Sequence, residues 1–422
     1  MTERREEMET PDGPPDEGNA NPPVQPRRGR LKRAVLTLAF LLVAGIAAFV
    51  IYNYIESVRL GDPFTAAKKA GIPLNYADPF FDKWGASRPT SPEENAAVLY
   101  EQAFPLLPPR LQGTSAPPIP FLTVTRLPLD PREPLPAEVV QASKAYLEPL
   151  GERFDLLHRG AGAPECYFTI KWEGFETVFQ HLTNSRSAAR HLALKACLAA
   201  EEGRSPEAAQ AMCDSLALSR GLYGEPAVIS GLVGCAVDSI SLSGADRLLS
   251  RAELSNDDLL TLQTALSTAA DRVSFHVCLT GEIAMQQDFF DRIQRGEDLF
   301  YVIGGGASPA QPNVARKTLF WLMRGSGYVQ ANRKKCLRET LKLIEIAGNP
   351  TPETLSDTYW QNWTDRVSSR RHILASMLLP ALGKSIVQGE KIRAKLRGAA
   401  TCCAAMRYRN DNDRWPENLD AL

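Results

Sequence analysis

The sequence predicts an all-α protein with one N-terminal transmembrane helix. Residues 34–55, AVLTLAFLLVAGIAAFVIYNYI, contain no charged side chain. Most of the chain after residue 136 is rich in Ala, Leu, Glu, Arg and Gln, which are strong helix formers. The one β-like run, YFTIKW at 167–172, is too short to form a sheet alone. A mostly helical body behind a membrane anchor is therefore the expected fold.

Residues 1–33 are predicted to be a disordered cytoplasmic tail. The segment carries seven acidic residues early and seven basic residues that are mostly late, with prolines between them. It has little apolar surface to bury, so it is not expected to fold.

The apolar run 34–55 is long enough to span a bilayer. As a helix its 22 residues rise about 33 Å, against ~30 Å for the hydrocarbon core. A buried core helix would show a polar stripe, and a cleaved signal peptide usually has a shorter apolar region of ~7–15 residues. Tyr52 and Tyr54 occupy the far end, where aromatic rings favour the membrane interface. An uncleaved anchor is the prediction.

Basic residues beside the span predict its direction and a lipid contact. The five are Arg27, Arg28, Arg30, Lys32 and Arg33. Because cytoplasmic flanks are richer in Lys and Arg, the N-terminus is expected in the cytoplasm and residues 56–422 outside it, at the plasma (inner) membrane. The same side chains are expected to attract anionic lipid.

The overall charge excludes one class of partner. The formal net charge is -1, and outside the tail the chain carries 41 basic and 42 acidic residues. A protein built to coat nucleic acid would have a basic excess. We therefore expect no nucleic-acid partner.

Residues 56–136 are expected to form a membrane-proximal segment that ends in a proline-rich strap. Ten of the 32 residues in 105–136 are proline, which excludes a helix and favours an extended strap. Phe121, Leu122, Val124 and Leu127 predict that it packs on its own domain. A ligand for a proline-binding module is the alternative.

The remaining body is expected to form one helical domain in two halves, 137–303 and 314–422, around a Gly/Pro loop at 304–313. Helix-start signals begin at Ser91, Ser205, Ser255 and Thr351. The expected helices cover 92–104, 137–158, 175–202, 206–222, 227–250, 256–295, 314–346 and 363–410.

Residues 188–220 suggest a helical hairpin. The stripe Leu192, Ala196 and Ala199 precedes Gly203, and the stripe Ala208, Met212 and Leu216 follows it. This stretch resembles a tetratricopeptide-type unit, although the aromatic positions of that repeat are missing. A shift of about 34 residues finds no second copy.

The sequence contains no recognisable catalytic, cofactor or metal motif. It lacks HExxH, GxSxG, SxxK and the phosphate-binding glycine patterns. The histidines are His158, His181, His191, His276 and His372, without metal-ligand spacing. We therefore assign no catalytic, cofactor-binding or metal-ligating residue. A cleft that collects His181, His191 or Glu282 would nevertheless favour an enzyme.

The eight cysteines form no CxxC pair, and most of them occupy helical patterns as small apolar residues. Cys197 and Cys213 lie at similar distances on either side of the hairpin turn. Their spacing suggests a disulfide across the hairpin as one hypothesis, and two free thiols as the other.

The C-terminal segment carries a specific turn signal. Tyr408, Asp411, Asn412, Trp415, Pro416, Leu419 and Leu422 follow a long helix. The segment resembles the end of the long helix of type II secretion pseudopilins, with Asp413 at the usual turn glycine. Asp and Asn tolerate the left-handed conformation, and Trp415 is expected to fold back as a hydrophobic cap.

A wider resemblance rests on three stretches: ENAAVLY at 94–100, the 188–220 hairpin and this tail. Together they resemble uncharacterised single-pass helical membrane proteins of planctomycete-type bacteria, which implies no known activity.

Two functional hypotheses follow. The first is a non-enzymatic, membrane-anchored helical module that binds or scaffolds other proteins of the bacterial cell envelope. The alternative is a hydrolase-type enzyme whose site is assembled from residues distant in sequence. A purely structural role is a third reading.

Overall fold

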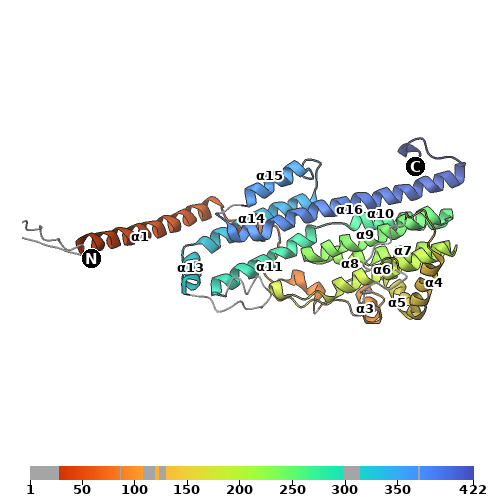
Figure 1. Cartoon of the computed structure of the whole chain (residues 1–422), viewed down its shortest axis with the longest axis horizontal. Coiled ribbons are helices and arrows are strands. Elements are labelled where there is room, and N and C mark those ends of the chain that lie inside the picture. Colours follow the sequence, from red (N-terminus) through yellow and green to blue (C-terminus); the bar gives the residue numbers. More distant parts are fainter. Residues whose placement is uncertain (1–27, 86, 108–118, 123–129, 298–313, 369–370) are drawn as a thin grey trace, which may run out of the picture. The chain divides into compact units, whose positions relative to one another are not determined.

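The computed structural model describes residues 28–85, 87–107, 119–122, 130–297, 314–368 and 371–422, and these form helices and no named strand (Figure 1). The chain divides into two compact units, Met1–Ile51 and Tyr52–Leu422. The all-α prediction is confirmed for the described residues. The predicted Gly/Pro loop at 304–313 lies outside them, as do residues 1–27, which include Arg27.

The first unit contains most of helix α1 (Arg28–Arg59), which continues into the second unit. Its apolar side chains, such as Leu36 and Phe40, are exposed. The helix begins at Arg28, so residues 28–33 are helical although we expected them in the disordered tail. Arg and Lys, together with Leu31, are good helix formers and extend the helix through Gly29.

The second unit is a helical body. Its longer helices are α6 (Gln180–Glu201), α7 (Ser205–Ala217), α9 (Val228–Arg251), α10 (Asn256–Arg272), α11 (His276–Arg295), α14 (Tyr328–Gly348) and α16 (Ile373–Asn412). Its shorter helices are α2 (Pro63–Lys69), α3 (Ala96–Ala103), α4 (Ala137–Leu147), α5 (Gly151–Gly162), α8 (Ser219–Gly224), α13 (Val314–Gly325) and α15 (Asp357–Val367). The 3₁₀ turns are η1 (Pro79–Trp84), η2 (Phe104–Leu106), η3 (Glu148–Leu150), η4 (Gly174–Glu176) and η5 (Leu419–Ala421).

Helix α16 organises the packing of this unit. It packs along α9, α10 and α14, and α6 packs against both α7 and α9 (Figure 1). The core between α3, α5, α6 and α9 includes Tyr100, Leu157, Leu192 and Val237, each of which is at most 1% exposed. Burying such side chains stabilises the fold by roughly 1.5–3 kcal/mol each.

Several helices that we expected to be continuous are broken, most clearly 256–295. Helix α10 begins after the predicted start signal at Ser255, which forms a capping box with Asp258, but it ends at Arg272 and α11 begins at His276. Phe275, 3% exposed, lies in the break. A Cβ at Gly231 or Gly389 would lie 2.7 Å or 2.8 Å from its ring, so the ring fills the space above both glycines. Packing of Phe275 against α9 and α16 therefore accounts for the break.

The predicted hairpin is present as α6 and α7, joined by a short turn. Gly203 adopts a positive φ of 73° in this turn, which glycine does without steric cost. The structure shows the pair of helices but not a tetratricopeptide-like array.

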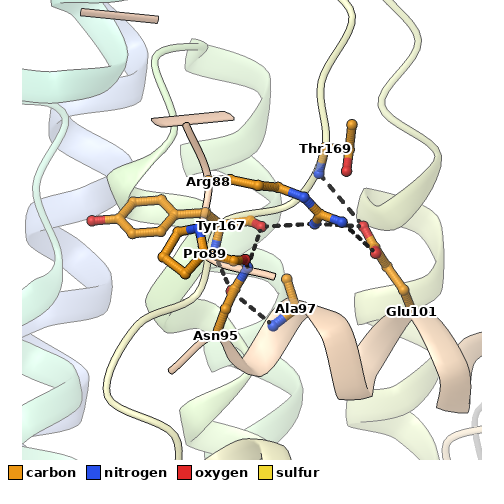
Figure 2. Close-up of polar contacts among 7 residues, drawn as sticks. All are labelled: Arg88, Pro89, Asn95, Ala97, Glu101, Tyr167 and Thr169. Atoms are coloured by element: carbon orange, nitrogen blue, oxygen red, sulfur yellow. Dashed lines mark hydrogen bonds and ion pairs between the residues drawn. The ribbon is translucent and has the colours of Figure 1, made fainter. Parts of the chain in front are cut away.

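Asn95 fastens the β-like run to the helical core (Figure 2). Its side chain accepts hydrogen bonds from the backbone N–H groups of Ala97 (3.2 Å) and Tyr167 (2.8 Å). Its Nδ2 donates to the carbonyls of Pro89 (2.8 Å) and Tyr167 (3.0 Å). Arg88 adds an ion pair to Glu101 and a bond to the Tyr167 carbonyl. The cap of α3 is thus Asn95 and not Ser91, because only Asn95 can bond both segments.

Between residues 108 and 129, the structure describes only residues 119–122 of the strap. Ile119 and Leu122 are buried against Leu194, with Phe121 packed beside them. This agrees with a strap that packs on its own domain. Val124 and Leu127 lie outside the described residues.

The pseudopilin-like turn closes α16 at Asn412. Asp413 adopts the left-handed conformation at φ 55° and ψ 17°, as predicted for the residue at the turn-glycine position. Trp415 remains 54% exposed, and the Arg409 guanidinium lies 4.9 Å from its ring centroid. The expected hydrophobic cap is therefore a cation–π contact at the surface.

Candidate binding cleft

The three residues singled out for an enzymatic site lie apart. His181, on α6, is 8% exposed, and its Nε2 lies 2.8 Å and 3.0 Å from the two carboxylate oxygens of Glu225. Its ring stacks on Phe168 with 4.3 Å between centroids. This is a buried pair that ties the loop after α8 to α6.

His191 is also internal. Its Nδ1 lies 2.7 Å from the Ser187 carbonyl, and its Nε2 lies 3.0 Å from the Tyr146 hydroxyl. Because a carbonyl only accepts, Nδ1 carries the proton and Nε2 accepts from Tyr146. Burial lowers the pKa of His191, which favours this neutral form.

Glu282, on α11, contacts a different part of the same loop. Its carboxylate accepts a hydrogen bond from the Val228 backbone N–H at 3.2 Å. Desolvation raises its pKa above the ordinary value. His181 and Glu282 thus bond to opposite ends of the segment 225–228. The linings of the cavities bounded by α4–α7 and by α2, η1, α11 and α14 include none of His181, His191 and Glu282.

Sequence reasoning missed a buried acid, Asp238. It is fully buried in α9 and accepts a 2.7 Å hydrogen bond from the Tyr223 hydroxyl. Burial raises its pKa from 3.8 to about 7. Asp238 is the one acidic residue within the otherwise uncharged run 226–245, and that isolation is a signal that could have identified it.

A cleft of about 520 Å³ lies between α4, α5, α6 and α7. This volume falls in the range of small-molecule and peptide side-chain pockets. Its apolar walls come from Leu147, Phe154 and Leu198. Its polar and charged walls come from Gln141, Lys144, Glu148, Asp155, Lys195, Glu202, Arg204 and Glu207. We call it the α4–α7 cleft.

Most charges around the α4–α7 cleft are already paired. Lys144 bonds Glu202 at 3.1 Å, and Arg204 pairs with both Glu202 and Glu207. Within the described part of the chain, Glu148 and Asp155 form no ion pair. The cleft therefore offers two carboxylates without a close ion pair, beside an apolar surface.

Lys195, on α6, also lines the cleft. Its Nζ lies 4.9 Å from the Phe154 ring centroid and 3.9 Å from Glu207. Burial lowers the pKa of Lys195, and the nearby carboxylates of Asp214 and Asp155 oppose that shift. The ammonium group is therefore shared between the Phe154 ring and the Glu207 carboxylate, with its stem packed along the cleft wall.

A second cavity of about 510 Å³ is bounded by α2, η1, α11 and α14. Its lining is largely apolar, with Ile72, Phe80 and Ile344, and His276 and Glu345 are its main polar groups. It offers few groups to orient a polar substrate.

The proposed disulfide between Cys197 and Cys213 is wrong in this structure, where all eight thiols are free. Cys197 packs against Leu135 and Val139, whereas the Cys213 Sγ lies 3.9 Å from the Thr261 carbonyl on α10. The two helices direct these thiols to different neighbours. Burial raises the pKa of Cys197 to about 11 and that of Cys213 to about 12.

Among the described residues, no three His, Cys, Asp or Glu side chains are grouped as they would be to hold a metal ion. No protein-family model matches the chain, and neither a curated protein nor a solved structure shows significant similarity to it.

Proposed function

We propose that this chain is a single-pass membrane protein whose helical body binds a partner protein of the bacterial envelope through the α4–α7 cleft. The N-terminal apolar helix supports the anchor: it is long and apolar enough to cross a membrane, and none of its apolar window is buried. A second helix of similar composition, Val228–Arg251, is 61% buried and acts as a core helix.

The α4–α7 cleft is the observation that carries the binding role. An apolar wall with charged groups at its edge is the usual recognition surface for an amphipathic segment. Because the basic side chains around it are paired and Glu148 and Asp155 are not, the cleft suits a segment that carries a basic residue next to an apolar one. Such a segment would gain two carboxylate partners and bury its apolar side chain.

Partner capture with matched variants tests this role. Ala145 is exposed on α4 and lines the cleft, so Ala145→Trp should fill it without disturbing the core. We expect Ala145→Trp and the double variant Glu148→Lys/Asp155→Lys to lose the cross-linked partner that the wild-type chain captures. Glu353→Lys, an exposed acid outside the cleft, should keep it. Equal capture by all variants would exclude the cleft as the binding site.

The predicted orientation is tested through Cys402, which is exposed on α16. A membrane-impermeant maleimide should label Cys402 in intact spheroplasts if residues 56–422 lie outside the cytoplasm. A Thr2→Cys variant on a Cys402→Ser background should react only after the membrane is permeabilised. The reverse pattern would overturn the orientation.

The hydrolase alternative gains no support from its three candidate residues. His181 and His191 are buried and hydrogen-bonded, and Glu282 is bonded to the backbone at a separate point. General acid–base catalysis needs such groups within reach of one substrate position. The resemblance of the tail to secretion pseudopilins remains compatible with a partner near envelope secretion machinery.

A further inference from the structure

One end of the helical body carries an unusual set of exposed apolar side chains. Trp321 on α13 is 68% exposed, and Ile373 and Met377 at the start of α16 are 54% and 51% exposed. Ile373 and Met377 are four residues apart and therefore share one helix face. Figure 1 shows α13 at the same end of the second unit as the beginnings of α14 and α16.

Contacts within the second unit connect this end to the last residues of the apolar run. The Lys334 Nζ donates to the Ser57 carbonyl at 3.1 Å, and the Arg371 guanidinium lies 5.7 Å from the Tyr52 ring centroid. The Ile373 backbone N–H donates to the Tyr328 hydroxyl at 3.1 Å, which joins the starts of α14 and α16. These segments therefore lie at the level of residues 52–57.

Helix α13 reaches the same level. It ends at Gly325, and a Cβ placed on Gly327 would lie 4.0 Å from the Asn53 Cβ. Trp321 precedes Gly325 by four residues, about 6 Å along the helix. If the bilayer interface falls near Tyr52 and Tyr54, Trp321 lies close to that interface.

The composition of α13 suits an interfacial position. Its sequence, VARKTLFWLMRG, combines bulky apolar residues with three basic residues and has no acidic residue. Helices of this kind lie in the membrane surface plane, and tryptophan favours the same zone. Arg371 adds positive charge that would attract anionic headgroups.

We propose that the surface formed by Trp321, Ile373 and Met377 inserts into the headgroup region of an anionic bilayer, so that the body is held against the membrane and not merely tethered to it. This proposal rests on the membrane anchor of the proposed function. It would restrict the directions in which the α4–α7 cleft can meet a partner.

Fluorescence quenching by brominated lipids tests the insertion. The full chain is placed in nanodiscs of phosphatidylcholine and phosphatidylglycerol, with plain or brominated acyl chains. We expect bromination to quench part of the wild-type tryptophan emission, and Trp321→Phe to remove most of that quenching. Nanodiscs of phosphatidylcholine alone should give weaker quenching, because the basic side chains lose their anionic partners.

Trp415 supplies the matched control. It is 54% exposed but lies beyond the far end of α16, whose 40 residues extend roughly 60 Å from Ile373. Trp415→Phe should leave the quenching unchanged. Absent quenching, or equal loss in both variants, would overturn the insertion.

Alkaline carbonate extraction separates the two proposals. A chain that resists extraction but shows no Trp321 quenching keeps its anchor and loses the interfacial contact. A chain released by carbonate lacks the anchor itself.

Discussion

The Tyr223 hydroxyl and the Asp238 carboxylate meet inside the helical body at 2.7 Å, with Tyr223 as donor. Asp238 comes from α9 and Tyr223 from α8, and neither contacts solvent appreciably. Burial raises the pKa of Asp238 to about 7, and it outweighs the hydrogen bonds from Tyr223 and Ser219 and the charge of Arg272 on α10, which lower that pKa. This pair makes the stability of the body sensitive to pH.

We expect Asp238→Asn to weaken the dependence of the free energy of unfolding on pH. Between about pH 4 and pH 7 the folded chain holds a proton on Asp238 that the unfolded chain has released, so the free energy of unfolding falls as pH rises through this window. The Asn variant lacks this titration. Its melting temperature relative to wild type should therefore be higher at pH 8 than at pH 5.

The exposed Asp271→Asn is the control for this comparison, since it should show the same pH profile as wild type. His191, whose pKa is lowered by burial, reduces the stability as the pH falls below about 6.5, which is opposite to the effect of Asp238. Because all three proteins contain His191, its effect cancels when their profiles are compared. An Asp238→Asn profile parallel to wild type would contradict the assignment.

Asn95→Ala should destabilise the chain by roughly 2–4 kcal/mol, because it leaves several buried backbone groups around Tyr167 without partners. Urea unfolding of the full chain in detergent measures this. Asp62→Ala removes an exposed cap of α2 and should cost only about 1 kcal/mol. Similar losses for the two variants would show that Asn95 acts as an ordinary cap.

Two glycine substitutions should change the stability of the chain in opposite directions. A Cβ on Gly281 would overlap the backbone of Pro226, so Gly281→Ala should destabilise the chain by about 1–3 kcal/mol or more. Gly398, inside α16, has open space around the same position, so Gly398→Ala should stabilise it by about 0.5–1 kcal/mol. Thermal unfolding of both variants checks the pair, and a destabilised Gly398→Ala would contradict the packing of α16.

Thiol alkylation should distinguish Cys402 from the other cysteines. Cys402 is exposed, whereas burial raises the pKa of Cys213 and Cys403 to about 12 and reduces their thiolate fraction. We expect one fast-reacting thiol in the folded chain and eight after unfolding without reductant. Mass spectrometry that finds Cys197 and Cys213 still protected after unfolding would restore the disulfide hypothesis.

Local signals in the sequence located several structural features. The Ser255 capping box and the turn at Asp413 are both formed, because each depends on residues within one helical turn. The apolar run at 34–55 is a continuous helix for the same reason: its conformation depends on local propensity.

Helix breaks and buried polar pairs could not be predicted from such local signals. The break at Phe275 depends on two glycines on other helices. Asn95 forms hydrogen bonds with the Tyr167 backbone, which is 72 positions away in the sequence. The α4–α7 cleft draws its walls from four helices. Periodicity identifies which side chains a helix buries, but not which neighbour receives them.

The sequence by itself therefore determined the helical class, the apolar N-terminal helix, the start of α10 at Ser255 and the turn at Asp413, since these follow from charge, hydropathy and contacts within a few residues. Only the tertiary structure decided that Asp238 is paired with Tyr223, that Cys197 and Cys213 point apart, and that an amphipathic cleft surrounds Lys195. Those outcomes depend on how helices cross, and the crossing geometry is set by the mutual packing of side chains far apart in the chain.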